Sequence, residues 1–402
     1  MKSPVKNLSA LILISVPLFS AAAVISPRVL KLHEELFVFD AHVHVIDRQL
    51  YHGGDIGQRV EDGQFDLARA KDGGIDAMFF SVFITEDYYP QRLETKQTFR
   101  LIDLALTQLE SNRDKIELAK NAGDIARINR AGKMAVVLDI EGGFDLDGDL
   151  GVLRDLYRLG VRSLQLSAHN WANNFADSCC SPPKNHGLNE RGRTLVREMN
   201  RLGMVINVSH ASDETIAQTV EISTAPIVAT HHGMRTLNNI PRNMPDDLMR
   251  QIATKGGVIG FQIGNEFHNV RAFNWRTEHA GKPFWDTSEI ANRKALLSIE
   301  EVDRKVAPQF PMVGVNTPEN ILLSPEEWIA VIEKAISVVG EDHVALGSDF
   351  DGGPTPPRGM HDISDLPQLT EAMVRRGWSG ERMRKFMGLN LLRVFAQITE
   401  HK

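Results

Sequence analysis

The chain has 402 residues, of which 42% are hydrophobic and 24% are charged, so it has enough apolar side chains for a large core and lacks the composition of a disordered protein. Its formal net charge of -7 argues against a nucleic-acid partner, because a polyanion requires a basic face on the protein. We expect one large domain over residues 24–402.

The first segment, residues 1–23, has the pattern of an export signal. Lys2 and Lys6 precede an apolar run from residue 8 to 25, and Ala21 to Ala23 offer an A-x-A cleavage site. We therefore predict a periplasmic or secreted protein. The alternative is an uncleaved membrane anchor, since the run approaches the roughly 18 to 20 residues that span a bilayer. No later segment has a transmembrane pattern.

Eight short apolar runs alternate with amphipathic stretches along the chain, which predicts a parallel sheet with helical crossovers. Eight such units favour a (β/α)8 TIM barrel. An open doubly wound sheet is the alternative, although no G-x-G-x-x-G sequence follows the first run. The runs are residues 37–44, 75–84, 134–143, 161–169, 204–210, 226–232, 256–264 and 343–353.

One connection, residues 265–342, is too long for a simple crossover and predicts an insertion before the last strand. Long connections of this kind are often lids over a binding site. Trp275 and Trp285 fit either an exposed lid surface or the core.

The chain has only two cysteines, Cys179 and Cys180, and they are adjacent. Neighbouring cysteines cannot form a disulfide of ordinary geometry that ties distant segments together. We therefore expect a fold that does not depend on disulfides.

Histidines and acids recur at the carboxyl ends of the predicted strands, which meet at one face of a barrel. They are His42, His44, His169, His210, His231, Glu141, Asp349 and Asp351. An H-x-H pair alone also fits ordinary core or surface histidines. Their shared position predicts a common pocket.

These residue types suit a pair of divalent cations. His42 and His44 lie two apart on a strand and therefore face the same side, as two ligands of one ion would. Glu141 can bridge two ions, and His210 and His231 can supply nitrogen ligands to the second. His232 leaves an ambiguity, because only one of two adjacent strand residues points inward.

Several motifs together resemble the membrane (renal-type) dipeptidase family, peptidase M19 of the amidohydrolase superfamily. The resemblance covers nearly the whole chain after the signal. The motifs are DIEGG (139–143), LSAHNWANNFADS (166–178), RLGMVINVSHAS (201–212), THHGMRTLNNIPRNMPDD (230–247), LGSDFDGG (346–353) and GLNLLRVF (388–395).

The resemblance implies two divalent metal ions, with zinc as the expected metal, held by His42, His44, Glu141, His210 and His231. It selects His231 over its neighbour. The chain departs from the family at position 44, where the pattern H-x-D predicts aspartate. A neutral imidazole there makes the site one charge unit more positive, which leaves the metal and the substrate class open.

The resemblance also implies the remaining roles. His169 corresponds to a histidine that stabilises the oxyanion, Arg242 to an arginine that grips the substrate carboxylate, and Asp349 to the acid that transfers a proton. Taken singly, these residues also fit a core histidine, a surface ion pair and a structural turn, and Asp351 fits the turn better.

The expected reaction is hydrolysis of a dipeptide, including one with a D-residue at its carboxyl end. The alternatives are hydrolysis of an N-acyl amino acid, a lactone or a phosphoester, or a catalytically silent barrel that binds metal or peptide. The expected partners are the small dipeptide, the membrane if the signal is uncleaved, and a second copy in a homodimer.

Overall fold

The computed structural model describes residues 25–142, 149–291, 297–314 and 316–400, and the predicted export signal lies outside them. All eight predicted strands are present in this part of the chain, most of them shorter than the apolar runs. The strands are β1 (Val38–His44), β2 (Ile75–Phe83), β3 (Ile116–Leu118), β4 (Met134–Glu141), β5 (Val161–Gln165), β6 (Val205–Asn207), β7 (Val228–His232), β8 (Val258–Phe261) and β9 (Val344–Leu346).

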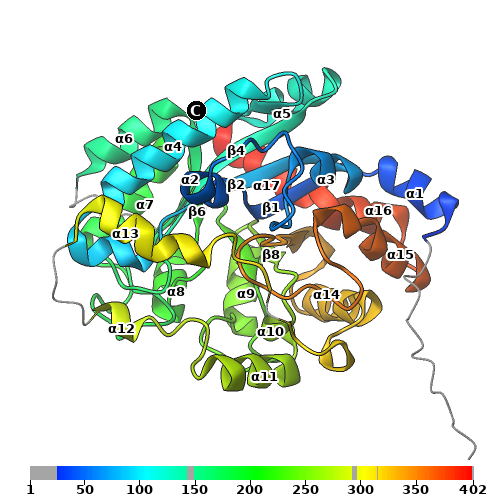
Figure 1. Ribbon diagram of the computed structural model, residues 1–402. Helices are drawn as coiled ribbons and strands as arrows, with labels where there is room; N and C mark the ends of the chain where they lie inside the picture. The colour runs from blue at the N-terminus through cyan, green and yellow to red at the C-terminus, as the bar shows by residue number, and fades with distance from the viewer. Residues whose placement is uncertain (1–24, 143–148, 292–296, 315, 401–402) are drawn as a thin grey trace, which may run out of the picture.

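The strands form a parallel barrel in the order β1-β2-β4-β5-β6-β7-β8-β9 (Figure 1). The segment after β9 completes the circle against β1, because Asp349 N donates to His42 O at 2.8 Å and His44 N donates to Phe350 O at 3.0 Å. The short β3 was not predicted; it pairs with the first residues of β4, beside the part that pairs with β5. The predicted (β/α)8 barrel is confirmed.

Helices surround the strands (Figure 1). Local signals set many of their ends: α14 begins with a capping box between Ser324 and Glu327, and α7 ends at Gly203, whose φ is 70°. No helix in the described part of the chain is long and apolar enough to cross a membrane. The helices are α1 (Pro27–Glu34), α2 (Asp47–His52), α3 (Leu67–Asp72), α4 (Glu94–Ser111), α5 (Ala122–Arg130), α6 (Leu150–Leu159), α7 (Glu190–Leu202), α8 (Asp213–Ile222), α9 (Asp246–Thr254), α10 (Asn265–His268), α11 (Val270–Ala280), α12 (Ser288–Ala291), α13 (Ile299–Val306), α14 (Pro325–Val339), α15 (Pro367–Arg375), α16 (Gly380–Arg384) and α17 (Asn390–Thr399).

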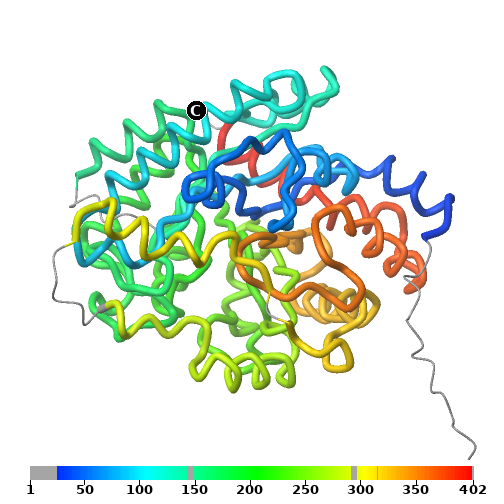
Figure 2. The backbone as a smooth tube through the Cα atoms, in the orientation of Figure 1, coloured from blue at the N-terminus to red at the C-terminus, as the bar shows by residue number. Residues whose placement is uncertain are grey.

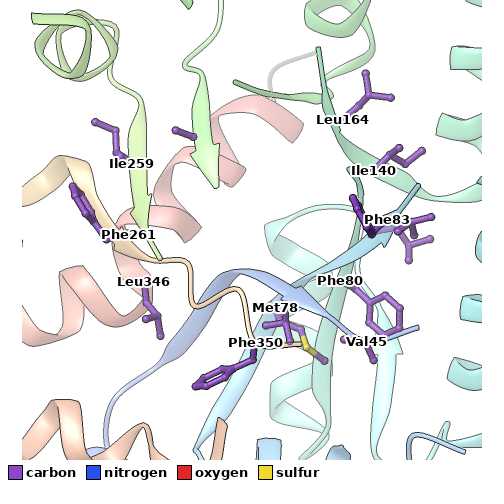
Figure 3. Packing of buried hydrophobic residues seen from close by; sticks show 14 of the residues in the cluster. Val45, Met78, Phe80, Phe83, Ile140, Leu164, Ile259, Phe261, Leu346 and Phe350 are labelled. Atoms are coloured by element: carbon purple, nitrogen blue, oxygen red, sulfur yellow. The ribbon is translucent and has the colours of Figure 1, made fainter. Parts of the chain in front are cut away.

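Alternate strand residues feed two separate apolar clusters. Side chains such as Met78, Phe80 and Ile140 point outward and pack beneath the helices (Figure 3). Their neighbours in sequence point into the barrel, where α17 closes the amino-terminal end. The ring of Phe395 on α17 lies 6.3 Å from that of Phe39, between centroids. The opposite end of the barrel remains for polar side chains.

The long connection before β9 is largely helical and contains α10 to α14. Figure 2 shows it, coloured yellow-green to orange, running across one side of the molecule. Trp275 and Trp285 are half-buried, and they stack on His279 and Phe273 within the same connection. The predicted insertion is confirmed, and its two tryptophans lie between the two alternatives, neither fully exposed nor fully buried.

Candidate active site

Irregularities in two strands aim the central histidines at the barrel mouth. The register of β1 against β2 shifts between Asp40 and Val43, so Phe39 packs inside the barrel while His42 and His44 reach its mouth. The register of β7 shifts between Ala229 and His232. These bulges re-aim side chains that a regular alternation would place elsewhere.

One oxygen of Glu141 faces the two histidines of β1. Glu141 Oε2 lies 2.8 Å from His42 Nε2 and 3.0 Å from His44 Nε2. The two Nε2 atoms are 3.3 Å apart, and Asp349 Oδ1 lies 3.4 Å from His44 Nε2. Two histidines and two carboxylates thus surround one point.

The other oxygen of Glu141 faces a second pair of histidines. Glu141 Oε1 lies 3.2 Å from both His210 Nε2 and His231 Nε2, and these two nitrogens are 3.0 Å apart. His231 therefore faces the centre, as the resemblance implied. His232 is buried, and neither of its ring nitrogens has a partner among the described residues.

The far nitrogen of each central histidine has a polar neighbour, which leaves every Nε2 directed at the centre. The Nδ1 partners are Asp139 for His42 at 3.5 Å, Asp47 for His44 at 3.3 Å, Asn170 for His210 at 3.1 Å and Thr230 for His231 at 3.0 Å. Such outer partners fix the ring and tautomer of metal-binding histidines.

The donor set fits a divalent cation. Imidazole nitrogens and carboxylate oxygens are the ligands that zinc and similar metals prefer. One atom each from His42, Glu141 and His231 lies within 4.8 Å of the others, and the same holds for His42, His44 and Asp349. Ser81 and Gln165 donate hydrogen bonds to the two oxygens of Glu141, at 3.0 and 3.1 Å, and so hold its orientation.

The pKa values of the two histidine pairs are shifted in opposite directions. Burial would lower the pKa of His42, but the carboxylates of Glu141, Asp139 and Asp349 raise it to about 9. Burial lowers the pKa of His231 to about 3 and that of His210 well below its usual value, with Arg242 adding to the effect at His210. At neutral pH the protein alone therefore favours a protonated His42 and a neutral His210 and His231.

Three of the proposed site residues have left-handed backbone conformations. The φ angles are 53° for His169, 64° for His210 and 65° for Asp349. Residues other than glycine seldom adopt these angles, and such strain concentrates at functional sites. Asp351 also has a positive φ, but it accepts hydrogen bonds from Gln64 N and Phe65 N and holds a loop, which is the structural role expected for it.

His169 and Arg242 lie at the edge of the histidine cluster. The ring of His169 is 4.0 Å from that of His210, and its Nδ1 lies 2.7 Å from Glu86 Oε1. Arg242 is fully buried and donates from Nη2 to His231 O at 3.0 Å. Its Nε and Nη1 have no partner in the described structure. The pKa of Arg242 is lowered by burial to about 10, so the guanidinium stays charged at neutral pH.

A cavity of about 300 Å³ opens over these side chains. Every proposed site residue lines it except His42, which lies beneath. The insertion before β9 contributes Phe267, Arg276, Phe284 and Met312 to its walls. The barrel mouth thus provides a closed set of polar groups with a partly apolar surround, as small-molecule sites do.

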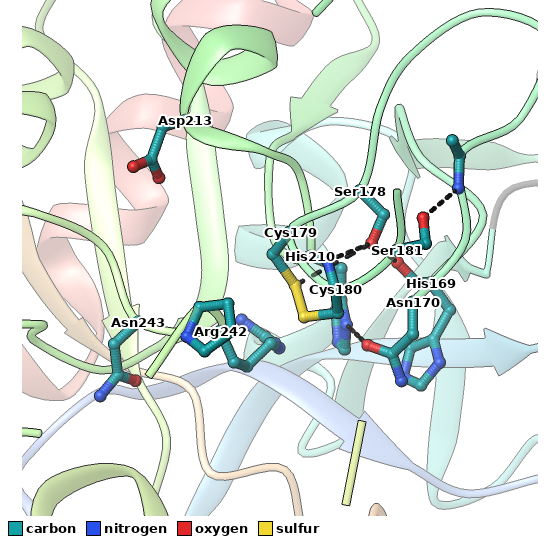
Figure 4. The surroundings of a disulfide bond; sticks show 12 residues. His169, Asn170, Ser178, Cys179, Cys180, Ser181, His210, Asp213, Arg242 and Asn243 are labelled. Atoms are coloured by element: carbon teal, nitrogen blue, oxygen red, sulfur yellow. Dashed lines mark hydrogen bonds between the residues drawn. A yellow bond between two sulfur atoms is a disulfide. The ribbon is translucent and has the colours of Figure 1, made fainter. Parts of the chain in front are cut away.

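The two cysteines are joined to each other near this cavity (Figure 4). The bond links neighbours and so, as expected, connects no distant segments. Cys179 N donates to His210 O at 2.8 Å, and Ser178 Oγ donates to His169 O at 2.8 Å. The loop that carries the disulfide therefore supports two of the site histidines.

The sequence reasoning missed the residues that orient the site. Asp47, Asp139 and Glu86 each contact a site histidine, and Asn170 contacts His210. Asp139 lies within the DIEGG motif and Asp47 follows His44 by three residues. The position of both residues close to the site motifs could have indicated their role from the sequence, whereas the contact of Glu86 with His169 depends on the tertiary structure.

The parallel barrel and the candidate metal-ligand cluster at the carboxyl ends of its strands are those expected of a metal-dependent hydrolase. A family model described as "Membrane dipeptidase (Peptidase family M19)" matches residues 27–402. Dipeptidase tcpJ of Claviceps purpurea (strain 20.1) is 31% identical over 349 residues, which are 84% of this chain and 70% of that protein.

Two solved structures share the fold. The probable dipeptidase PvdM from Pseudomonas aeruginosa has a TM-score of 0.76 at 24% identity, over 93% of this chain and 98% of that one. A metallo peptidase from Rhodobacter sphaeroides, liganded with a phosphinate mimic of the dipeptide L-Ala-D-Ala, has a TM-score of 0.70 at 22% identity, over 90% and 99%. The chain belongs to the membrane dipeptidase family, peptidase M19, and is a metal-dependent dipeptidase.

Proposed function

We propose that the protein holds two divalent cations, with zinc as the expected metal, and that His42 and His44 bind one while His210 and His231 bind the other. The observation that carries this proposal is the position of Glu141, whose two oxygens face the two histidine pairs separately at 2.8 to 3.2 Å. A carboxylate in that position bridges two ions. When bound, the ions would activate a water molecule and polarise the substrate carbonyl.

We assign the proton transfer to Asp349. Its carboxylate lies beside His44, and although burial alone would raise the pKa of Asp349, His231, His44 and His42 hold it below its usual value. The ionised group can accept a proton from the attacking water and pass it to the leaving amine.

His169 and Arg242 would bind the substrate. Glu86 holds the Nδ1 side of His169, which leaves Nε2 to donate to the developing oxyanion. Arg242 keeps its charge and has two nitrogens without a partner among the residues that the structure describes, so it fits the free carboxylate of a dipeptide. We propose dipeptides as the substrates, including those with a D-residue at the carboxyl end, which the ligand of the Rhodobacter sphaeroides structure resembles.

A pair of substitutions tests these roles. Asp349→Asn should lower kcat by at least about a hundredfold and leave the metal content unchanged, because it removes the proton carrier and keeps the five proposed ligands. Glu141→Gln should lower both, since one bridging charge serves both ions. The measurements are elemental analysis and turnover of a dipeptide panel set beside lactones. Full activity in Asp349→Asn, or unchanged metal content in Glu141→Gln, would contradict the assignment.

We also propose that residues 1–23 direct export and are removed. The support is the sequence pattern alone. Sequencing the amino terminus of protein recovered from the periplasm or medium should give a chain that begins near Val24, whereas a retained Met1 would indicate an anchor. Attachment to a membrane and the homodimer stay predictions.

A further inference from the structure

One wall of the cavity consists of two phenyl rings with an arginine at each end. The Arg242 guanidinium carbon lies 5.8 Å from the centre of the Phe267 ring. The rings of Phe267 and Phe284 are 4.8 Å apart between centroids, and the Arg276 guanidinium carbon lies 5.1 Å from the centre of Phe284. All four side chains line the cavity.

Arg276 is fixed in place but keeps free hydrogen-bond donors. It projects from α11 in the insertion, and its Nη1 donates to Gly353 O at 3.0 Å and lies 3.4 Å from Glu266 Oε1. Within the described residues, its Nε and Nη2 make no hydrogen bond, and 17% of the side chain is exposed. The position is thus set before a ligand arrives, and the side chain lines the cavity.

The cavity contains more donors than one carboxylate requires. Arg242 offers Nε and Nη1, and Gln262 has a fully buried carboxamide with neither polar atom partnered in the described structure. The acids that line the cavity are Glu141 and Asp349, which belong to the proposed metal and proton machinery. Buried donors without partners are costly, so this surplus indicates a ligand with more than one anionic group.

We propose that Arg276 selects dipeptides whose carboxyl-terminal residue has an acidic side chain, aspartate or glutamate. The inference rests on the proposed function, in which Arg242 holds the terminal carboxylate. A residue anchored there lies at one end of the phenyl wall, so its methylene groups pack on Phe267 and Phe284. Its side-chain carboxylate then meets Arg276, whose charge strengthens the hydrogen bond.

Substrates that differ only in charge test the proposal. On the metal-loaded enzyme, kcat/KM for alanyl-glutamate should exceed that for alanyl-glutamine by about tenfold or more, with both L and D forms of the second residue measured. Arg276→Met keeps the packing on Phe284 and removes the charge, so it should bring this ratio to about one. The loss of activity should fall on alanyl-glutamate far more than on alanyl-glutamine, because only the glutamate side chain carries a negative charge.

Arg271→Met is the matched control, because Arg271 lies exposed on the same helix and does not line the cavity. It should leave the ratio unchanged. Two results would overturn the role of Arg276: a wild-type ratio near one, or an Arg276→Met enzyme whose kcat/KM falls equally for both substrates. Turnover of alanyl-alanine would still support the proposed dipeptidase function in either case. If the turnover of glutamyl-alanine also fell in Arg276→Met, Arg276 would bind the side chain of the amino-terminal residue, which would contradict the proposal. If the metal-loaded wild-type enzyme hydrolysed none of these dipeptides, the proposed function itself would be refuted.

Discussion

His44 stands where the M19 pattern predicts an aspartate, and its surroundings show how the substitution is accommodated. Asp47 Oδ2 lies 3.3 Å from His44 Nδ1, so a carboxylate is still present one imidazole away from the centre. A carboxylate behind a histidine ligand makes the imidazole a stronger donor. The extra positive charge expected from the sequence is therefore partly offset by a residue three positions further along the chain.

Asp349, the proposed proton carrier, can take its position only because residue 352 is a glycine and has no side chain. A Cβ atom at this position would lie 1.9 Å from Asp349 Oδ1 and 2.8 Å from His44 Cδ2. Gly352→Ala should therefore displace Asp349 and lower kcat by about a hundredfold, because small misplacements of catalytic groups are costly. Steady-state kinetics on a dipeptide measures the effect.

Gly380→Ala provides the comparison. A Cβ there meets only the end of the Arg384 side chain, at 3.4 Å, in the first turn of α16. This variant should keep the wild-type kcat. Equal activity in the two variants would show that Asp349 tolerates the displacement, which would argue against its assigned role.

Among the single elements, α17 packs against the inside of the barrel without forming part of the site. Phe395 is fully buried, and its ring contacts the rings of Phe39 and Phe79 at 6.3 and 5.9 Å between centroids. Phe39 lies at the amino-terminal end of β1, away from the histidines, and Phe79 lies in the middle of β2. The helix therefore fills the end of the barrel that the metal ligands do not occupy.

Phe395→Ala should lower the free energy of unfolding by about 3 to 5 kcal/mol, because it leaves a cavity inside the barrel. Denaturant unfolding measures the loss, and the folded enzyme should retain its kcat. Gln397→Ala, on the exposed face of the same helix, should change the free energy by no more than about 0.5 kcal/mol. If both variants unfold at the wild-type denaturant concentration, α17 does not support the barrel.

For the molecule as a whole, the proposed metal ligands connect distant parts of the chain. They come from β1, β4 and β7, and from the segment that follows β6. The two ions that they would hold would tie the strands together and would bind only to the folded protein. Metal should therefore raise the melting temperature, and a chelator should lower it.

The size of this stabilisation should depend on pH. His42 has a pKa of about 9 in the folded protein without an ion, above its usual value. Its protonated form stabilises the metal-free fold fully below about pH 6.5, and this contribution disappears as the pH rises through 9. A metal ion needs the neutral ring, so it must displace that proton below pH 9.

We therefore expect the metal-induced rise in Tm to be larger at about pH 8.5 than at about pH 6, with proton release detectable by calorimetry in different buffers. His231, whose pKa is about 3, releases no proton in this range. A Tm rise that is equal at the two pH values, without proton release, would contradict this account of the site.

The sequence by itself determined the eight strands, their parallel order and the gathering of His42, Glu141, His210 and Asp349 at one end of the barrel. The reason is that strand-helix alternation specifies a barrel, and a barrel brings the carboxyl ends of all its strands together. It also identified the family, because several motifs matched along nearly the whole chain.

The contacts that orient the site residues could be found only in the tertiary structure. The inward direction of His231 depends on a shift in strand register, and the contacts of Glu86 with His169 and of Asp351 with Gln64 join segments far apart in sequence. The position of Arg276 over Phe284 depends on how the insertion folds back over the barrel. Such contacts arise from the packing of whole elements, which local residue patterns do not encode.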